Sequence, residues 1–339
     1  MKQTRKLLAA LLAALTFCAI LAIPTPGVPL NAGRDALNGQ FTDGKHGAYD
    51  YVAFTPDLSK GGKRPLMVWL HGSGSGSSPR AQLRWYCFSN WASDEYQSRF
   101  GEGGCFLLAP RASASIANAY DATMCGGLKS VIDAFIAENR DYIDTNRIYL
   151  AGYSTGGSMV WYMLDAYPTF FAAALPLASL IQPTLSGVEK LRDVSIWTFT
   201  SDRDPYVGAT TTAALPSFRH LCSVSNRPED VRMTRFSECF LADGSKKQED
   251  GHLASDAEHY VWECVTFDMF MADGQTPYAC ASTKNGAGTQ LTFTPGDALI
   301  TWLAQQKRPE QPVKHRTWLD KALDALRALL RAILALFQF

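Results

Sequence analysis

The sequence predicts an α/β fold built on a doubly wound, mostly parallel β-sheet. Strand-like and helix-like segments alternate from about residue 47 onward, which is the rhythm of βαβ units. Residues 65–70 form a near-continuous apolar run, typical of a strand that is buried on both faces of a parallel sheet. Apolar residues make up 47% and charged residues 19% of the 339-residue chain, which allows a sizeable core and excludes wholesale disorder.

The expected elements follow in chain order. Strands are predicted at 49–54, 65–70, 105–109, 148–151, 172–177 and 195–200. Helices are predicted at 128–142, where apolar residues recur at helical spacing, at 155–166 and at 297–305. The last helix is expected to end a single domain of residues 47–306. Residues 24–46 are expected to be an N-terminal extension of this domain.

The N-terminus has the pattern of an export signal. Lys2, Arg5 and Lys6 precede the uncharged residues 7–23, and Pro24 follows. We therefore expect residues 1–23 to be a signal peptide that sends the protein to the periplasm or outside the cell, with a retained membrane anchor as the alternative. No other apolar run of that length occurs in the sequence, which excludes a polytopic membrane protein.

The C-terminus predicts a separate element. Residues 307–315 are polar and contain proline, which indicates a linker, and residues 316–339 have the pattern of an amphipathic helix. Three roles stay open for this helix: packing on its own domain, self-association or partner docking, and association with a membrane surface.

Charge and cysteine usage exclude some partners. Lys plus Arg and Asp plus Glu are equal at 32 each, which argues against a nucleic-acid partner. Seven cysteines follow the predicted signal, without a CxxC pair or metal-ligand spacing to a histidine, so no metal is expected: Cys87, Cys105, Cys125, Cys222, Cys239, Cys264 and Cys280. Up to three disulfides are expected in an oxidising compartment, with Cys264–Cys280 the favoured pair; the alternative is that most are buried apolar thiols.

The chemistry is predicted around Ser154. Gly152-Tyr153-Ser154-Thr155-Gly156 is a G-x-S-x-G pattern between a predicted strand and a predicted helix. This is the nucleophile-elbow pattern, in which a tight turn lifts the serine hydroxyl clear of the sheet. The alternative is an ordinary strand-to-helix turn.

A second loop is predicted to serve the same site. His71-Gly72-Ser73 follows the buried 65–70 strand, and the N–H of Ser73 or Gly72, together with that of Thr155, is the expected oxyanion hole. The alternative is a flexible glycine-serine loop without a function. A phosphate-binding loop is excluded, because no Gly-Lys-Ser/Thr closes it.

Residues 142–157 resemble the secreted α/β-hydrolase esterases, a group that includes polyhydroxybutyrate depolymerases, feruloyl and acetylxylan esterases and related predicted peptidases. Residues 65–74 resemble the oxyanion loop of that group, and 106–110 resemble its next strand. The resemblance covers about residues 47–306 and implies a sheet of the α/β-hydrolase type. Tyr153 and Thr155 depart from many members, and the stretch of residues 264–295 is longer than expected, so the substrate class does not transfer.

The fold type implies the chain order Ser, Asp, His for a catalytic triad. Asp204 follows the 195–200 strand and matches the Asp-x-x-Val spacing of the group, so it is the expected acid. Asp202 is the alternative acid; if it is not catalytic, it is expected to cap the turn. His259 resembles the group's base, because an aromatic residue follows it closely, and His252 is the alternative. His71 precedes the acid and is expected to shape the oxyanion loop.

The expected function is that of a serine hydrolase that cleaves small or polymeric carboxylic esters through an acyl-enzyme, with Ser154, His259 and Asp204 as its triad. No cofactor is expected. The alternatives are a serine peptidase with the same triad and a catalytically silent binding protein of the same fold.

Overall fold

The computed structural model describes residues 34–73, 78–85, 88–111, 120–239, 248–249, 252–253, 257–266, 281–291 and 298–309. The chain divides into two compact units, residues 1–308 and 309–339. The predicted signal peptide, most of the predicted linker and the predicted C-terminal helix lie outside the described residues. Within the described part of the chain, no helix combines the length and apolar character needed to cross a bilayer.

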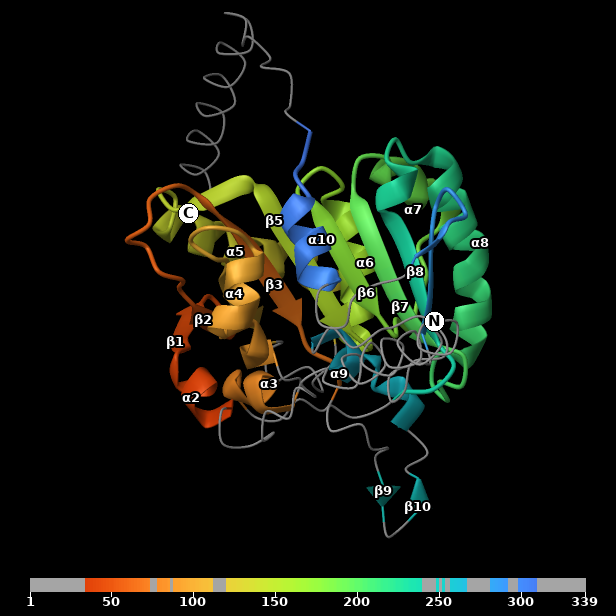
Figure 1. Cartoon of the computed structure of the whole chain (residues 1–339), viewed down its shortest axis with the longest axis horizontal. Coiled ribbons are helices and arrows are strands. Elements are labelled where there is room, and N and C mark those ends of the chain that lie inside the picture. Colours follow the sequence, from red (N-terminus) through yellow and green to blue (C-terminus); the bar gives the residue numbers. More distant parts are fainter. Residues whose placement is uncertain are drawn as a thin grey trace, which may run out of the picture. The chain divides into compact units, whose positions relative to one another are not determined.

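A ten-stranded sheet organises the described part of the first unit, in the order β1-β2-β4-β3-β5-β6-β7-β8-β11-β12 (Figure 1). Its strands are β1 (Thr42–His46), β2 (Tyr49–Phe54), β3 (Arg64–Leu70), β4 (Phe106–Pro110), β5 (Ile143–Tyr153), β6 (Ala173–Leu177), β7 (Ser195–Ser201), β8 (Val231–Phe236), β11 (Ala281–Asn285) and β12 (Gln290–Leu291). Pairing is parallel from β4 through β8 and antiparallel at both edges. This is the predicted doubly wound, mostly parallel sheet.

Helices cover both faces of the sheet because its central strands are apolar on both sides. In β3, Met67 and Trp69 belong to one buried cluster, whereas Leu66 and Val68 belong to the other. Buried residues of α3 (Arg80–Trp85), η1 (Phe88–Ala92), α4 (Asp94–Arg99), α9 (Val261–Thr266) and α10 (Leu299–Gln305) join the first cluster. Buried residues of α5 (Cys125–Glu138), α6 (Thr155–Ala166), α7 (Leu185–Val188), η3 (Glu189–Leu191) and α8 (Gly208–Val224) join the second. Figure 1 shows α4 and α10 in front of the strands.

Short elements complete the described structure. They are α2 (Arg34–Gly39), η2 (Ala122–Met124), η4 (Pro228–Asp230), η5 (Ala257–His259) and the two-stranded hairpin of β9 (Gln248–Glu249) and β10 (His252–Leu253). The buried Trp91 of η1 donates its indole N–H to the carbonyl of Thr266 at 3.1 Å, which fixes the end of α9 against the first helical layer.

Two of the predicted elements differ from the structure by more than two residues at one end or at both. The strand at 49–54 and the helix at 155–166 form as predicted, but the predicted helix 128–142 is α5, which ends at Glu138. Asn139 closes that helix, with its N–H and its side-chain amide both donating to the carbonyl of Phe135. The chain is extended again from Ile143, so β5 is much longer than the predicted 148–151 strand.

The sheet also reaches beyond the predicted 47–306 domain. β1 pairs with β2 through a turn at Gly47, whose φ is +57°. Because the side chains of β1 are exposed or half-buried and mostly polar, they give no alternating apolar signal. At the other end, the guanidinium of Arg308 donates to the carbonyls of Thr169 and Thr145 at 2.6 and 2.8 Å, so the chain is still held to the domain there.

Candidate active site

Ser154 lies in a strained turn between β5 and α6. Its backbone φ is +56° and its ψ −116°, values that a residue with a side chain rarely adopts. The flanking glycines are required by close packing. A Cβ at Gly152 would lie 2.3 Å from the carbonyl oxygen of Gly156, and a Cβ at Gly156 would lie 2.2 Å from that of Leu70. The G-x-S-x-G pattern therefore forms a nucleophile elbow at the carboxyl edge of the parallel strands.

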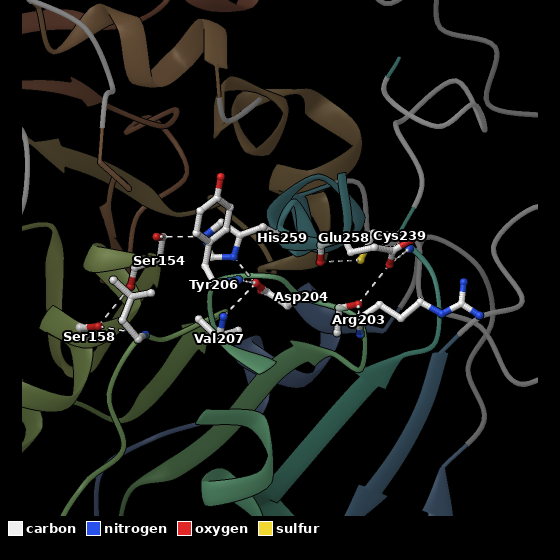
Figure 2. Close-up of polar contacts among 11 residues, drawn as sticks. Ser154, Ser158, Arg203, Asp204, Tyr206, Val207, Cys239, Glu258 and His259 are labelled. Atoms are coloured by element: carbon white, nitrogen blue, oxygen red, sulfur yellow. Dashed lines mark hydrogen bonds and ion pairs between the residues drawn. The ribbon is translucent and has the colours of Figure 1, made fainter. Parts of the chain in front are cut away.

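His259 connects Ser154 to a carboxylate (Figure 2). Its Nε2 lies 3.0 Å from Oγ of Ser154, which is 105 residues earlier in the chain, and its Nδ1 lies 2.6 Å from Oδ2 of Asp204. Because a carboxylate only accepts hydrogen bonds, Nδ1 carries a hydrogen and donates a hydrogen bond to Asp204. Nε2 of the neutral ring can then accept a hydrogen bond from the serine hydroxyl. The residue is buried, with 6% of its surface exposed.

Asp204 is fully buried and held from two sides. It lies just after β7, and its side chain has no exposed surface. Oδ1 accepts the N–H groups of Tyr206 and Val207 at 2.9 and 3.0 Å, while Oδ2 faces His259. These three donors compensate for the burial of the negative charge and fix the plane of the carboxylate.

The two alternative residues lie elsewhere. Asp202 accepts hydrogen bonds from the guanidinium of Arg235, with N–O distances of 2.9 and 2.7 Å, so it forms an ion pair with β8. His252 belongs to β10 and pairs with Glu249 across the β9–β10 hairpin. The structure thus brings Asp204 and His259 to Ser154, whereas Asp202 pairs with Arg235.

Two tyrosine rings lie against the His259 imidazole. The ring centroids of Tyr153 and Tyr206 are 5.0 and 4.9 Å from that of His259, in tilted arrangements. Tyr153 is buried, whereas Tyr206 has 61% of its surface exposed. Two aromatic rings therefore contact the imidazole, and one of them, that of Tyr206, is exposed. No sequence pattern indicated a role for Tyr206.

The predicted oxyanion donors lie on two neighbouring elements. Thr155 is the first residue of α6 and is buried, and the first N–H groups of a helix have no partner within it. Gly72 is buried and Ser73 exposed, directly after β3, the strand that pairs with β5. Residues 74–77 lie outside the described part of the chain.

His71 is a buried neutral side chain at the start of this loop. Its Nδ1 lies 2.7 Å from the carbonyl oxygen of Gly72, and its ring lies 4.6 Å from that of Tyr120. Burial lowers the pKa of His71 to about 4; the hydrogen bond to Gly72 opposes this shift, and the charge of Arg111 adds to it. The imidazole is therefore uncharged at neutral pH and holds the main chain beside Gly72.

Glu258 is a site residue that the sequence analysis did not identify. Its Oε2 accepts two hydrogen bonds, from the hydroxyl of Ser201 at 3.1 Å and from the N–H of Cys239 at 3.0 Å (Figure 2). Its position directly before His259 is the one sequence feature that could have indicated it. No group of three or more His, Cys, Asp or Glu residues that could hold a metal occurs among the residues that the structure describes.

Comparisons with known proteins agree with this architecture. Residues 127–201, which include the elbow, match the model of the prolyl oligopeptidase family. A poly(3-hydroxybutyrate) depolymerase of Ralstonia pickettii is 28% identical over 149 residues, which cover 41% of this chain and 29% of that protein. The crystal structure of a thermostable esterase superposes with a TM-score of 0.54 at 25% identity, covering 68% of this chain and 61% of the other. The matches thus span less than two thirds of either relative.

The sheet order, the strained elbow and these similarities lead to one conclusion about the fold. The chain is an α/β hydrolase in fold, and in sequence it resembles the esterase, depolymerase and serine-peptidase members of that superfamily.

Proposed function

We propose that this protein is a serine hydrolase that cleaves carboxylic esters through an acyl-enzyme. The observation that carries the proposal is the chain of two hydrogen bonds from Ser154 through His259 to Asp204. A serine hydroxyl is a weak nucleophile unless a base takes its proton, and this arrangement supplies the base and the group that orients it.

In the proposed reaction, Oγ of Ser154 attacks the ester carbonyl carbon while Nε2 of His259 takes the hydroxyl proton. The negative charge on the former carbonyl oxygen is stabilised by the N–H of Thr155 and that of Ser73 or Gly72. His259 then gives its proton to the leaving alcohol. A water molecule, deprotonated by the same imidazole, releases the acid, and Asp204 stabilises the imidazolium in both halves of the reaction.

Ester cleavage is supported by the depolymerase and esterase similarities, and a serine peptidase is the second candidate because the elbow region matches the prolyl oligopeptidase family. Small and polymeric esters are both open as substrates. Export is part of the same proposal, because residues 1–23 have the pattern of a signal peptide.

The test compares wild type, Ser154→Ala and the matched control Ser186→Ala, which removes an exposed serine of α7. Each is assayed with p-nitrophenyl acyl esters of increasing chain length and with peptide p-nitroanilides, and is labelled with a fluorophosphonate. We expect higher kcat/KM on esters than on peptides, and loss of turnover and labelling only in Ser154→Ala. Faster peptide cleavage would favour the peptidase, and a folded wild type inert in all three assays would favour the binding protein.

A further inference from the structure

Cys239 and Cys264 form a pair of buried thiols beside the His259 loop. Cys239 follows β8 and has 2% of its surface exposed; Cys264 lies in α9 and has 3% exposed. The structure describes both as thiols, and they are joined by a side-chain hydrogen bond. Two segments, one before and one after His259, thus bring their cysteine side chains within hydrogen-bonding reach inside the same buried cluster.

Glu258 fixes the position of one member of this pair. The N–H of Cys239 donates to Oε2 of Glu258 at 3.0 Å, and the Cys239 thiol donates to the carbonyl oxygen of the same residue, with 3.6 Å between sulfur and oxygen (Figure 2). The backbone and the side chain of Cys239 are therefore both held against the residue that precedes His259.

The pair differs from the other described cysteines. Cys105 is fully buried in the core, and its thiol donates to the neighbouring carbonyl of Phe106 at 3.2 Å. Such a residue behaves as a small apolar side chain. Cys222 is half-buried in α8. Cys239 and Cys264, by contrast, are close enough for a side-chain hydrogen bond, and closeness of two cysteines is the first requirement of a disulfide.

We propose that Cys239 and Cys264 are joined by a disulfide bond when the chain folds in an oxidising compartment. The two thiols lose two electrons and two protons as the S–S bond forms. A disulfide oxidant, such as oxidised glutathione, accepts them and is reduced to two thiols by exchange through a mixed disulfide. This pairing replaces the Cys264–Cys280 pair expected from the sequence; Cys280 lies outside the described residues.

The bridge forms before the site closes. The hydrogen bond to Cys264, burial and the negative charge of Glu258 raise the pKa of the Cys239 thiol, so little thiolate is present in the folded state. Exchange needs a thiolate and access for the oxidant, and both are available only while β8 and α9 are still coming together. For the same reason, the finished bond resists soluble reductants as long as the protein stays folded.

The bond closes a covalent loop that carries Glu258 and His259. It connects the end of β8 to α9 and restricts the unfolded chain between residues 239 and 264. The inference does not depend on the chemistry at Ser154, because its readout is the identity of the linked cysteines rather than turnover.

The first experiment maps the linkage in the full chain. The protein is refolded in a glutathione redox buffer, remaining thiols are alkylated in denaturant, and peptides are identified without reduction. Trypsin leaves Cys264 and Cys280 on one peptide, residues 248–284, so a second protease that cleaves before Asp268 is added to separate them. A peptide pair that links Cys239 to Cys264 supports the proposal. Alkylation of both residues, or linkage of either one to another cysteine, overturns it.

The second experiment measures what the bond does. We expect Cys239→Ser, Cys264→Ser and the double variant to lower the urea midpoint by about the same amount, roughly 1 M. The matched control Cys222→Ser should keep the linkage. Dithiothreitol should reduce the wild-type bond in denaturant but not in native buffer. A double variant that loses the sum of the two single losses would show that the residues contribute only by packing. If the serine variants do not fold, the wild-type linkage map still decides the proposal.

Discussion

Oε2 of Glu258 lies 3.1 Å from the hydroxyl of Ser201, at the end of β7. The contact joins two segments that are 57 residues apart in the chain and connects the residue before His259 to the strand that leads to Asp204. His259 directly follows Glu258, and Asp204 lies three residues after Ser201. The Glu258–Ser201 contact therefore helps to hold His259 and Asp204 at hydrogen-bonding distance.

Removing the Glu258 carboxylate should therefore misplace the imidazole. We expect Glu258→Ala to lower kcat about 10–100-fold with little change in KM, because the residue positions His259 without contacting substrate. Both hydrogen bonds reach the same oxygen, so the amide oxygen of Glu258→Gln can accept both, and this variant should restore most of the activity. Steady-state kinetics on a short p-nitrophenyl ester measures kcat and KM separately for each variant. Equal losses in the Ala and Gln variants would show that the charge, rather than the position, matters.

Asp204→Asn tests the proposed acid. The amide carries no negative charge, and its NH₂ group can donate to Nδ1, which favours the imidazole tautomer with its proton on Nε2. That tautomer cannot take the serine proton, so kcat should fall about 10⁴-fold while the protein stays folded. Asp202→Asn is the matched control. It removes only a half-exposed ion pair with Arg235, worth about 1 kcal/mol or less, and kcat should stay near that of wild type. The reverse result would assign the acid to Asp202.

His259→Ala should lower kcat by about four orders of magnitude, because the proton of Ser154 then has no acceptor. His252→Ala, in β10, should leave kcat within about twofold. Initial rates with p-nitrophenyl acetate compare the two variants, and circular dichroism verifies that each is folded. Loss of activity in His252→Ala alone would move the base to the hairpin.

His71 makes stability depend on pH on the acid side. Its pKa is lowered to about 4 in the folded protein, so between that value and 6.5 the unfolded chain binds more protons than the folded one. The stabilisation is complete above pH 6.5 and declines as the pH falls toward 4; between pH 7 and 5 the loss is about 2 kcal/mol.

Urea unfolding of wild type and His71→Asn at pH 7 and pH 5 isolates this contribution. The variant cannot take up that proton in its unfolded state, so its free energy of unfolding should change less over this interval, by about 2 kcal/mol. Parallel pH dependences of the two proteins would mean that folding does not lower the pKa of His71.

The elbow and the central strands were predictable because their signals are local. Gly152 and Gly156 are set by close backbone contacts within one turn, and the β3 run is apolar because both of its faces are buried. The Asp-x-x-Val spacing favoured Asp204 over Asp202, and the N–H groups of Tyr206 and Val207 that bind Asp204 lie within that spacing. The ion pair of Asp202 with Arg235 of β8 is a tertiary contact, and no local pattern contains it.

β8 itself escaped prediction because arginines interrupt its apolar pattern. The guanidinium of Arg232 lies 4.9 and 5.4 Å from the ring centroids of Trp197 and Trp302. A charged residue therefore packs against the two indole rings, where the hydrophobic pattern of a buried strand predicts an apolar residue. Burial lowers the pKa of Arg232 to about 10, yet the ring faces offset part of the desolvation of its charge. Such a contact joins residues far apart in sequence and is visible only in the folded chain.

At position 154 thermal stability and the proposed chemistry favour different residues, because the strained backbone destabilises a serine whose hydroxyl the reaction needs. Only glycine adopts a φ of +56° with a ψ of −116° without a steric penalty, and for serine that penalty is about 1–3 kcal/mol. A library of variants at this position, sorted for thermal tolerance alone, should therefore enrich glycine and discard the hydroxyl. Engineering of this scaffold toward higher melting temperature has to keep Ser154 fixed, because blind optimisation would begin by removing it.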